Sequence, residues 1–316
     1  MPDVRIGVVG ATGAVGTVTL ELLAERGFDE VRAFASARSA GRTVPLGGRE
    51  LLVEEATPEG LAAGDLDLVF FSVGTDASRE LVPHAVRGGA VVIDKSDAYR
   101  LRDGVPLVVA GVNDHALDGG AIVANPNCSA MQLTCVLEPL REAAGLARVR
   151  LATYQSASGA GDAGIERLRS LGVAEGDLGM DWELDGEEFT EEWKLRAETR
   201  KILELPDLPL HATCVRVPVL VGHAQAVWLE TESPLSPDEA REALASSAQV
   251  ELAELPTPGE AAGRDSVLVG RIRRDTAGEG LALWVVNDNL RKGAALNAVQ
   301  IAELLLARRA LEHVSK

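Results

Sequence analysis

The stretch RIGVVGATGAVG, residues 5–16, decides the fold of this chain. Its apolar start, residues 5–9, predicts a short buried strand, and residues 14–25 predict a helix. Between them come glycines spaced three residues apart, which let the backbone turn tightly and approach a pyrophosphate closely. The N-terminus of the helix adds free N–H groups and a partial positive charge. The pattern indicates a dinucleotide site, although a plain strand–helix turn also uses glycine.

The rest of the first half repeats this alternation of strand and helix. Residues 31–35, 66–72 and 90–93 are short apolar runs that predict strands, and residues 76–87 predict a helix. Apolar strands that alternate with helices are typical of a doubly wound parallel sheet. We therefore expect an α/β Rossmann domain over residues 1–127.

The second half has a different pattern, which predicts an α+β domain with a mixed or antiparallel sheet. Residues 162–198 are strongly acidic, and we expect their first part to form a solvated loop. The remaining expected elements are helices at 129–144, 236–246 and 293–306, and strands at 148–156, 215–221, 226–230, 267–273 and 281–286.

Composition limits the classes of function. The length of 316 residues fits roughly two domains. A net charge of −17 argues against binding to nucleic acid or to anionic membranes. No signal peptide is visible and no apolar run reaches about 18 residues, so we expect a cytoplasmic protein. Three scattered cysteines are too few for a disulfide framework or a zinc site, and no metal site is expected.

The end of the second predicted strand indicates which dinucleotide binds. Enzymes that use NAD usually carry a carboxylate there for the ribose 2′-hydroxyl. This strand instead ends in Ser36, Arg38 and Ser39, two hydroxyls and a guanidinium that suit a 2′-phosphate. We therefore predict NADP, with the alternative that Arg38 is only a surface charge.

Cys128 is the candidate nucleophile. It lies in NPNCS, residues 125–129, between a predicted strand and a predicted helix. A helix N-terminus lowers the pKa of a thiol and favours the nucleophilic thiolate. Free cysteines are also commonly buried and structural, which is how we interpret Cys135 and Cys214.

Six motifs occur in this order along the chain: GATGAVG (10–16), ASARSAGR (35–42), NPNCS (125–129), YQSASGAG (154–161), CVRVPVLVGH (214–223) and DNLRKGAALNAVQIAELL (288–305). Together they resemble the bacterial aspartate-β-semialdehyde dehydrogenase family. The resemblance implies a catalytic and dimerisation domain at residues 128–292, inserted before a last helix that returns residues 293–316 to the Rossmann domain. It implies reduction of L-aspartyl 4-phosphate to L-aspartate 4-semialdehyde with NADPH and release of phosphate, toward lysine, threonine and methionine. It also implies a homodimer or homotetramer.

The catalytic roles follow from the matching positions. Cys128 matches the nucleophile that forms a thioacyl intermediate, and Gln155 matches the residue that orients it. His223, expected in a turn, matches the acid/base residue, and an imidazole is suited to accept the thiol proton. Asn127 and the N–H groups at the helix start are expected to stabilise the oxyanion.

The substrate contacts are also carried over by the resemblance. Arg216 matches the clamp for the α-carboxylate, and Arg100 matches a phosphate-binding arginine. Glu191 and Lys194 match the residues that meet the ammonium group and the phosphate. Two alternatives stay open: this pair is an ordinary surface salt bridge, or Glu192 takes the place of Glu191.

The resemblance places the cofactor along both domains, with Asn289 at its nicotinamide end. The expected cofactor-binding residues are Gly10, Thr12, Gly13, Ala14, Val15, Ser36, Arg38, Ser39, Thr75, Ser158, Gly159 and Asn289.

The chain departs from the family pattern at residues 95–97, 110–113 and 222–225, and most clearly between Ala160 and Glu191. That segment is short and acidic where the family frames its substrate. Two alternatives follow: a divergent paralogue that acts on a modified acyl phosphate or aldehyde, and a non-catalytic NADP-binding regulator. Retention of the catalytic set argues against the regulator.

Overall fold

The structure is a computed structural model that describes residues 4–117, 119–171 and 182–314. It divides into two compact units, residues 1–126 with 294–316 (unit 1) and residues 127–293 (unit 2). Within the described ranges, no helix combines the length and the apolar character that a bilayer span requires.

The sheet of unit 1 is doubly wound, as the strand–helix alternation predicted. Its strand order is β3-β4-β2-β1-β5-β6-β7, and every pair is parallel except β3 with β4. The hairpin of β3 and β4 was not predicted, and it turns at Gly47 and Gly48, which both adopt positive φ. The strands are β1 (Ile6–Val9), β2 (Val31–Ala35), β3 (Thr43–Leu46), β4 (Arg49–Glu55), β5 (Leu68–Phe71), β6 (Val91–Asp94) and β7 (Ile122–Ala124).

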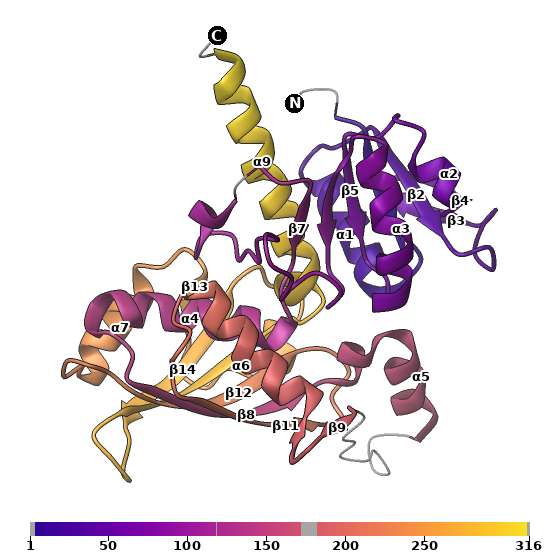
Figure 1. Ribbon diagram of the computed structural model, residues 1–316. Coiled ribbons are helices and arrows are strands. Elements are labelled where there is room, and N and C mark those ends of the chain that lie inside the picture. The colour runs from indigo at the N-terminus through magenta and orange to yellow at the C-terminus, as the bar shows by residue number, and fades with distance from the viewer. Residues whose placement is uncertain (1–3, 118, 172–181, 315–316) are drawn as a thin grey trace. The chain divides into compact units, whose positions relative to one another are not determined.

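Helices cover both faces of this sheet, as right-handed crossovers on either side of β1 require (Figure 1). α3 packs on β5 and β6, while α1 contacts β1 and α9. α9 extends further than the helix predicted to end at residue 306. The helices of unit 1 are α1 (Ala14–Glu25), α2 (Pro58–Leu61), α3 (Thr75–Arg87), the 3₁₀ turn η1 (Asp114–Ala116) and α9 (Leu296–Val314).

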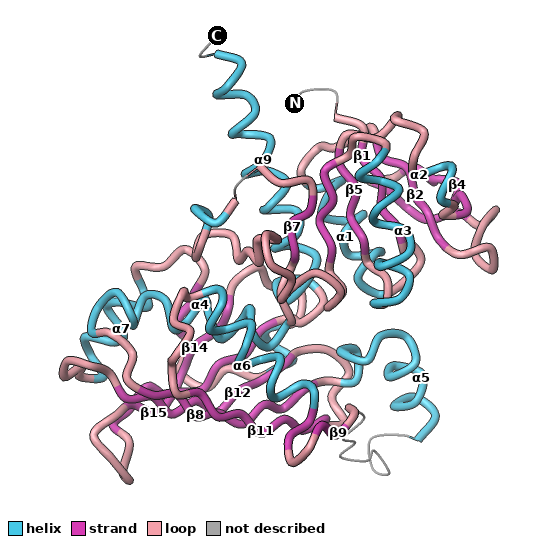
Figure 2. The backbone as a smooth tube through the Cα atoms, in the orientation of Figure 1, coloured by secondary structure: helices cyan, strands magenta, loops and turns pink. Residues whose placement is uncertain are grey.

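The sheet of unit 2 is mixed, in the order β11-β8-β12-β15-β14-β13. The pairs β11–β8 and β14–β13 are parallel, and the pairs between them are antiparallel. Figure 2 shows α4, α6 and α7 together on one face of it. The strands are β8 (Arg148–Gln155), β11 (Leu210–Arg216), β12 (His223–Glu230), β13 (Val250–Leu252), β14 (Val267–Arg274) and β15 (Leu281–Asn287).

Two strand predictions in unit 2 were wrong. β11 lies five residues before the strand expected at 215–221, because Val217 to Val221 contains Pro218 and forms a loop. His223 is the first residue of β12, not a turn residue, and it pairs with Asn287 of β15.

The segment expected as a solvated loop contains regular structure. It begins as helix α5 and, after residues outside the description, continues as a short hairpin of β9 and β10. The helical elements of unit 2 are α4 (Cys128–Ala144), η2 (Ala157–Ala160), α5 (Gly161–Leu171), α6 (Thr190–Ile202), α7 (Pro237–Ala245), α8 (Pro258–Ala261) and η3 (Arg291–Ala295), and the hairpin strands are β9 (Leu184–Asp185) and β10 (Glu188–Phe189).

The pleat of β8 decides which of its residues face the helices. Its side chains alternate between exposed and buried, so Thr153 and Gln155 are buried while Arg150 and Tyr154 are exposed. In the parallel pairing with β11, Gln155 lies opposite Arg216. The predicted site residues of these strands therefore share one end of the sheet.

Candidate active site

The turn after β1 has the backbone of a phosphate-binding loop. Gly10 adopts φ +85°, and a Cβ there would lie 2.4 Å from the Ser72 carbonyl oxygen. A Cβ on Gly16 would lie 2.0 Å from the Gly10 carbonyl oxygen, so both positions require glycine. Gly13 is the N-cap of α1 and supplies no side chain to cap the first turn. The N–H groups at Ala14 and Val15 therefore stay open to an anion, which fits a dinucleotide phosphate.

The end of β2 carries the predicted 2′-phosphate contacts. Ser36 and Arg38 are exposed, and the Ser39 N–H donates to the Ser36 carbonyl at 2.8 Å to form a turn. Two hydroxyls and a guanidinium on one exposed turn suit a phosphate monoester. Their role toward NADP stays a prediction.

Arg100 is held by backbone carbonyls at the end of the unit 1 sheet. Its Nε donates to the Asn125 carbonyl at 3.0 Å, and its Nη2 donates to the Lys95 carbonyl at 2.5 Å. Nearby, the Thr75 hydroxyl donates to the Asp97 carboxylate, one of the residues that depart from the family pattern. Thr75 is thus engaged with protein, and its predicted contact with the cofactor is untested.

Buried Asp94 organises the same strand end. Its carboxylate accepts bonds from the hydroxyls of Ser78 at 2.7 Å and Ser96 at 2.6 Å. Burial raises the pKa of Asp94 above its ordinary value, because the charged form loses its hydration.

Cys128 opens α4, as the sequence predicted. Asn127 is the N-cap, and its Oδ1 accepts from the N–H groups of Ser129 at 2.8 Å and Ala130 at 3.3 Å. These two N–H groups were expected to bind an oxyanion, but they are already paired. Asn127 therefore fixes the start of the helix, and with it the backbone of the nucleophile.

The two adjacent glutamates, Glu191 and Glu192, have different hydrogen-bond partners. Glu191 Oε1 accepts from Asn127 Nδ2 at 3.0 Å and from Gln155 Nε2 at 2.9 Å. Glu192 instead accepts from the N–H groups of Phe189 and Cys214, both at 2.9 Å, and so caps α6 and ties it to β11. Glu191 is the carboxylate that joins two predicted site residues. It is 8 % exposed, so it is a buried carboxylate and not a surface residue.

Glu198 was missed by the sequence analysis. Its Oε2 accepts from the Asn127 N–H at 2.6 Å, and the side chain is 1 % exposed. It lies seven residues, about two turns, after Glu191 on the same helix, and Lys194 lies half-buried between them. The spacing of seven residues could have indicated that Glu198 lies on the same face of the helix as Glu191. The sequence analysis missed it because the acidic composition of this segment was taken as a sign of solvent exposure.

His223 is completely buried and is held by the backbone. Its Nδ1 accepts from the Ser156 N–H at 3.0 Å, so Nδ1 carries no proton and the neutral ring carries its proton on Nε2. Nε2 is buried and has no hydrogen-bond partner among the described residues. Burial, followed by the nearby charge of Arg216, lowers the pKa of His223 to about 3.

Asn289 joins the loops that flank His223. Its Oδ1 accepts from the Gly222 N–H and the Ser156 hydroxyl, both at 2.9 Å, and its Nδ2 donates to Ser158 Oγ at 2.9 Å. Asn289 and Ser158 were predicted to contact the cofactor. The structure shows them joined to each other, and their contact with NADP stays a prediction.

Arg216 comes close to His223 above Gly159. A Cβ on Gly159 would lie 2.7 Å from Arg216 Nη1 and 3.0 Å from His223 Nε2. The same Nη1 donates to the Ser156 carbonyl at 3.0 Å. Arg216 is 8 % exposed, and its central guanidinium carbon lies over the ring of Trp182, 4.7 Å from the centroid. A planar cation and a ring N–H therefore meet at one point of unit 2.

The three cysteines differ in burial. Burial raises the pKa of Cys214 to about 12 and also raises that of Cys135. Cys128 is partly exposed, whereas the other two are buried. Only a thiolate is nucleophilic, so the structure supports Cys128 as the reactive cysteine.

Comparisons with known proteins identify the family of this chain. Residues 5–119 match the family model described as "Semialdehyde dehydrogenase, NAD binding domain", and residues 178–292 match "Semialdehyde dehydrogenase, dimerisation domain". The aspartate-semialdehyde dehydrogenase of Corynebacterium glutamicum is 44% identical over 95% of this chain and 99% of its own length. The chain belongs to the aspartate-semialdehyde dehydrogenase family.

Solved structures of this family share the fold. Aspartate semialdehyde dehydrogenase II from Vibrio cholerae, complexed with ASA, superposes with a TM-score of 0.91 at 39% identity, over 96% of this chain and 98% of that one. The Candida albicans enzyme with NADP gives a TM-score of 0.79 at 28% identity, over 96% and 99% of the two chains. The prediction of the family from six motifs is confirmed.

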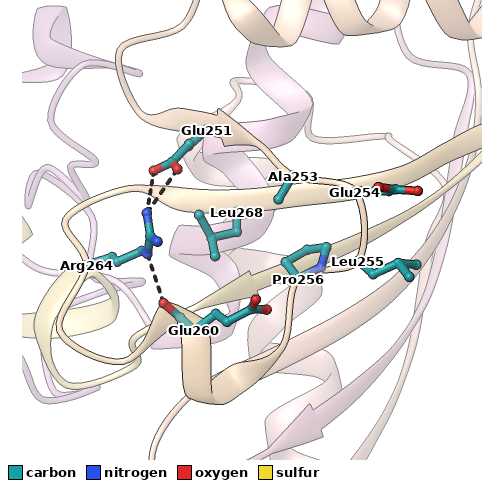
Figure 3. A pocket seen from close by; sticks show the side chains of 8 residues that line it. All are labelled: Glu251, Ala253, Glu254, Leu255, Pro256, Glu260, Arg264 and Leu268. Carbon is teal, nitrogen blue, oxygen red and sulfur yellow. Dashed lines mark hydrogen bonds and ion pairs between the residues drawn. The ribbon is translucent and has the colours of Figure 1, made fainter.

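A separate hollow in unit 2 does not belong to this site (Figure 3). Its one cation, Arg264, is bound to Glu251 at 2.9 Å and to the Glu260 carbonyl at 2.9 Å. Its cation is therefore already paired with the wall of the pocket, and none of the predicted site residues lines it. Its lining residues are Glu251, Ala253, Glu254, Leu255, Pro256, Glu260, Arg264 and Leu268.

Proposed function

We propose that this protein is an NADP-dependent, phosphorylating aspartate-semialdehyde dehydrogenase. It reduces L-aspartyl 4-phosphate to L-aspartate 4-semialdehyde and releases phosphate, a step toward lysine, threonine and methionine. The observation that carries the proposal is the bonded path from Asn127, next to the nucleophile, through Glu191 to Gln155. Ser156, the next residue, then holds both His223 and Arg216.

Cys128 begins the reaction in this proposal. Its sulfur attacks the carbonyl carbon of the acyl phosphate, the carbon–oxygen bond to phosphate breaks, and a thioester remains on the enzyme. The residues at the α1 N-terminus and at the end of β2 would hold NADPH, which would supply a hydride to the thioester carbon. The carbon–sulfur bond then breaks, which releases the aldehyde and returns Cys128 as the thiolate. Arg100 and Lys194 are the proposed phosphate contacts.

His223 acts as a donor in this scheme. Its Nδ1 is occupied by the Ser156 N–H, so Nε2–H is the group it offers to the reacting atoms. It suits stabilisation of the Cys128 thiolate and of developing negative charge on the substrate. The expectation that the resting imidazole accepts the thiol proton needs a lone pair at Nε2, which this tautomer does not provide.

The substrate is recognised by charge. The planar guanidinium of Arg216 suits the α-carboxylate, and the buried carboxylate of Glu191 suits the ammonium group. The two lie on β11 and α6, elements that pack directly on each other. A substrate that lacks the carboxylate or the ammonium group leaves one of these buried charges unpaired. The enzyme should therefore have a much lower kcat/KM for such a substrate.

We propose that unit 2 forms a homo-oligomer through the sheet face opposite α4, α6 and α7. Tyr154 and Trp228 are exposed there, and the rings of Tyr154 and Trp284 contact each other at 5.5 Å. The matching dimerisation model over residues 178–292 supports association through unit 2. The three cysteines form no disulfide, which supports a cytoplasmic location.

Steady-state kinetics tests the proposed function. NADP reduction is measured with L-aspartate 4-semialdehyde, with and without phosphate, beside succinate semialdehyde, which lacks the amine. The proposal predicts activity that requires phosphate and the amine. Oxidation of succinate semialdehyde at an equal specificity constant, or turnover independent of phosphate, would overturn it.

A further inference from the structure

Trp182 contacts Arg216, the proposed substrate-binding arginine. It belongs to none of the six motifs of the sequence. It lies in the segment between Ala160 and Glu191, where the sequence departs most from the family pattern. Its ring centroid is 4.7 Å from the central guanidinium carbon of Arg216, which is a cation–π distance. The divergent segment thus returns to the site and supplies an aromatic face.

The guanidinium of Arg216 is restrained on two sides. Its central carbon lies over the Trp182 ring, and Nη1 donates to the Ser156 carbonyl. A planar fork binds a carboxylate with two bonds only when its plane is fixed. The ring and the carbonyl together limit the movement of that plane.

The hairpin that follows Trp182 is anchored to α6. The Trp182 and Phe189 rings contact each other at 6.3 Å, and the Phe189 N–H is held by the Glu192 carboxylate at 2.9 Å. Arg196 makes two bonds of 2.7 Å to Glu188 of the same hairpin. The start of α6 also carries Glu191, so one hairpin links the proposed carboxylate contact to the proposed ammonium contact.

We propose that Trp182 is a positioning residue that fixes the Arg216 guanidinium for the substrate carboxylate. This inference rests on the proposed function, in which Arg216 binds that carboxylate. Preorganisation of this kind acts on substrate binding, because the cation stays present but must reorient before it pairs. The bond-forming steps at Cys128 do not depend on Trp182.

Trp182→Leu removes the aromatic face and keeps an apolar side chain. It is expected to raise the KM for L-aspartate 4-semialdehyde about tenfold, with kcat within twofold and the KM values for NADP and phosphate unchanged. Trp182→Phe keeps a smaller ring and is expected to raise that KM only two- to threefold. Leu184→Ala is the matched control, since this exposed residue of the same hairpin is expected to change none of these constants.

Two results overturn the proposal. One is an unchanged KM for the semialdehyde in Trp182→Leu, and the other is an equal loss for all three substrates, which indicates a structural role. If Trp182→Leu does not fold, Trp182→Phe decides alone by the same criterion. Arg216→Lys tests the proposed carboxylate site separately from the role of Trp182. An unchanged KM for the semialdehyde in this variant refutes the carboxylate site at Arg216, and the Trp182 proposal with it.

Discussion

The Ser156 N–H donates to Nδ1 of His223 at 3.0 Å, and this one bond fixes the tautomer of a buried histidine. A backbone N–H cannot rotate away or accept a proton, so it restricts the ring more firmly than a side chain does. The Ser156 hydroxyl also lies 3.0 Å from the same nitrogen but has a second partner, Asn289 Oδ1. Ser156→Ala therefore keeps the tautomer.

The first prediction concerns stability and pH. The pKa of His223 is about 3 in the folded protein, against an ordinary 6.5. Between these pH values the unfolded chain binds a proton at His223 that the folded chain does not bind. The contribution of His223 to the free energy of unfolding is therefore fully present above pH 6.5 and is lost as the pH falls below it. The parent should lose about 2 kcal/mol more than His223→Gln between pH 7.5 and 5.0. Denaturant unfolding of both proteins measures this, and equal losses would show that His223 does not titrate as described.

The second prediction concerns Gly159. Its φ is not positive, so alanine brings no backbone strain, but a Cβ would lie 2.7 Å from Arg216 Nη1 and 3.0 Å from His223 Nε2. Gly159→Ala should displace these two groups and lower kcat/KM by about 100-fold, a cost of about 2.7 kcal/mol. The melting temperature should change little. Activity within threefold of the parent would mean that the two side chains need not stay where they are.

The third prediction concerns cofactor choice. Arg38 is exposed on the turn after β2, where a 2′-phosphate is expected. Arg38→Ala should weaken NADP binding by about 1.5–3 kcal/mol and leave NAD binding almost unchanged. Titration of the apo-protein with each cofactor decides. An equal loss for both would assign Arg38 to support of the turn.

The fourth prediction concerns thiol reactivity. Burial raises the pKa of Cys135 and of Cys214, whereas Cys128 is partly exposed at a helix N-terminus. Iodoacetamide at pH 7 should therefore modify Cys128 at least tenfold faster than the other two. Peptide mass spectrometry over time measures the three rates. Faster modification of either buried cysteine would remove the structural basis for choosing Cys128.

The sequence predicted most of the fold because local patterns determine it. The helix at Ala14–Glu25 and the strand at Val31–Ala35 were predicted to the residue, since periodicity and glycines mark their ends. The β3–β4 hairpin was missed because most residues of its strands are exposed or only half-buried. α5 was missed because acidic composition was taken as a sign of a loop.

The site was less predictable than the fold, because its contacts join residues that are distant in sequence. The motifs gave the residue types, but only the structure shows that Glu191 faces Asn127 while Glu192 caps α6. Glu198 and Trp182 had no motif, and each contacts a site residue through tertiary packing. A sequence pattern cannot show which face of an acidic helix is buried.

The central claim is that Cys128 forms a thioester with the substrate acyl group. The direct test is a phosphate-free mixture of the protein, NADP and L-aspartate 4-semialdehyde, followed by absorbance and by peptide mass spectrometry. The account predicts a single burst of about one NADPH per chain, an acyl adduct on the Cys128 peptide, and release of the adduct when phosphate is added. Cys128→Ala should show no burst while its affinity for NADP stays nearly unchanged. Continuous turnover without phosphate, or an adduct on another residue, would contradict the account.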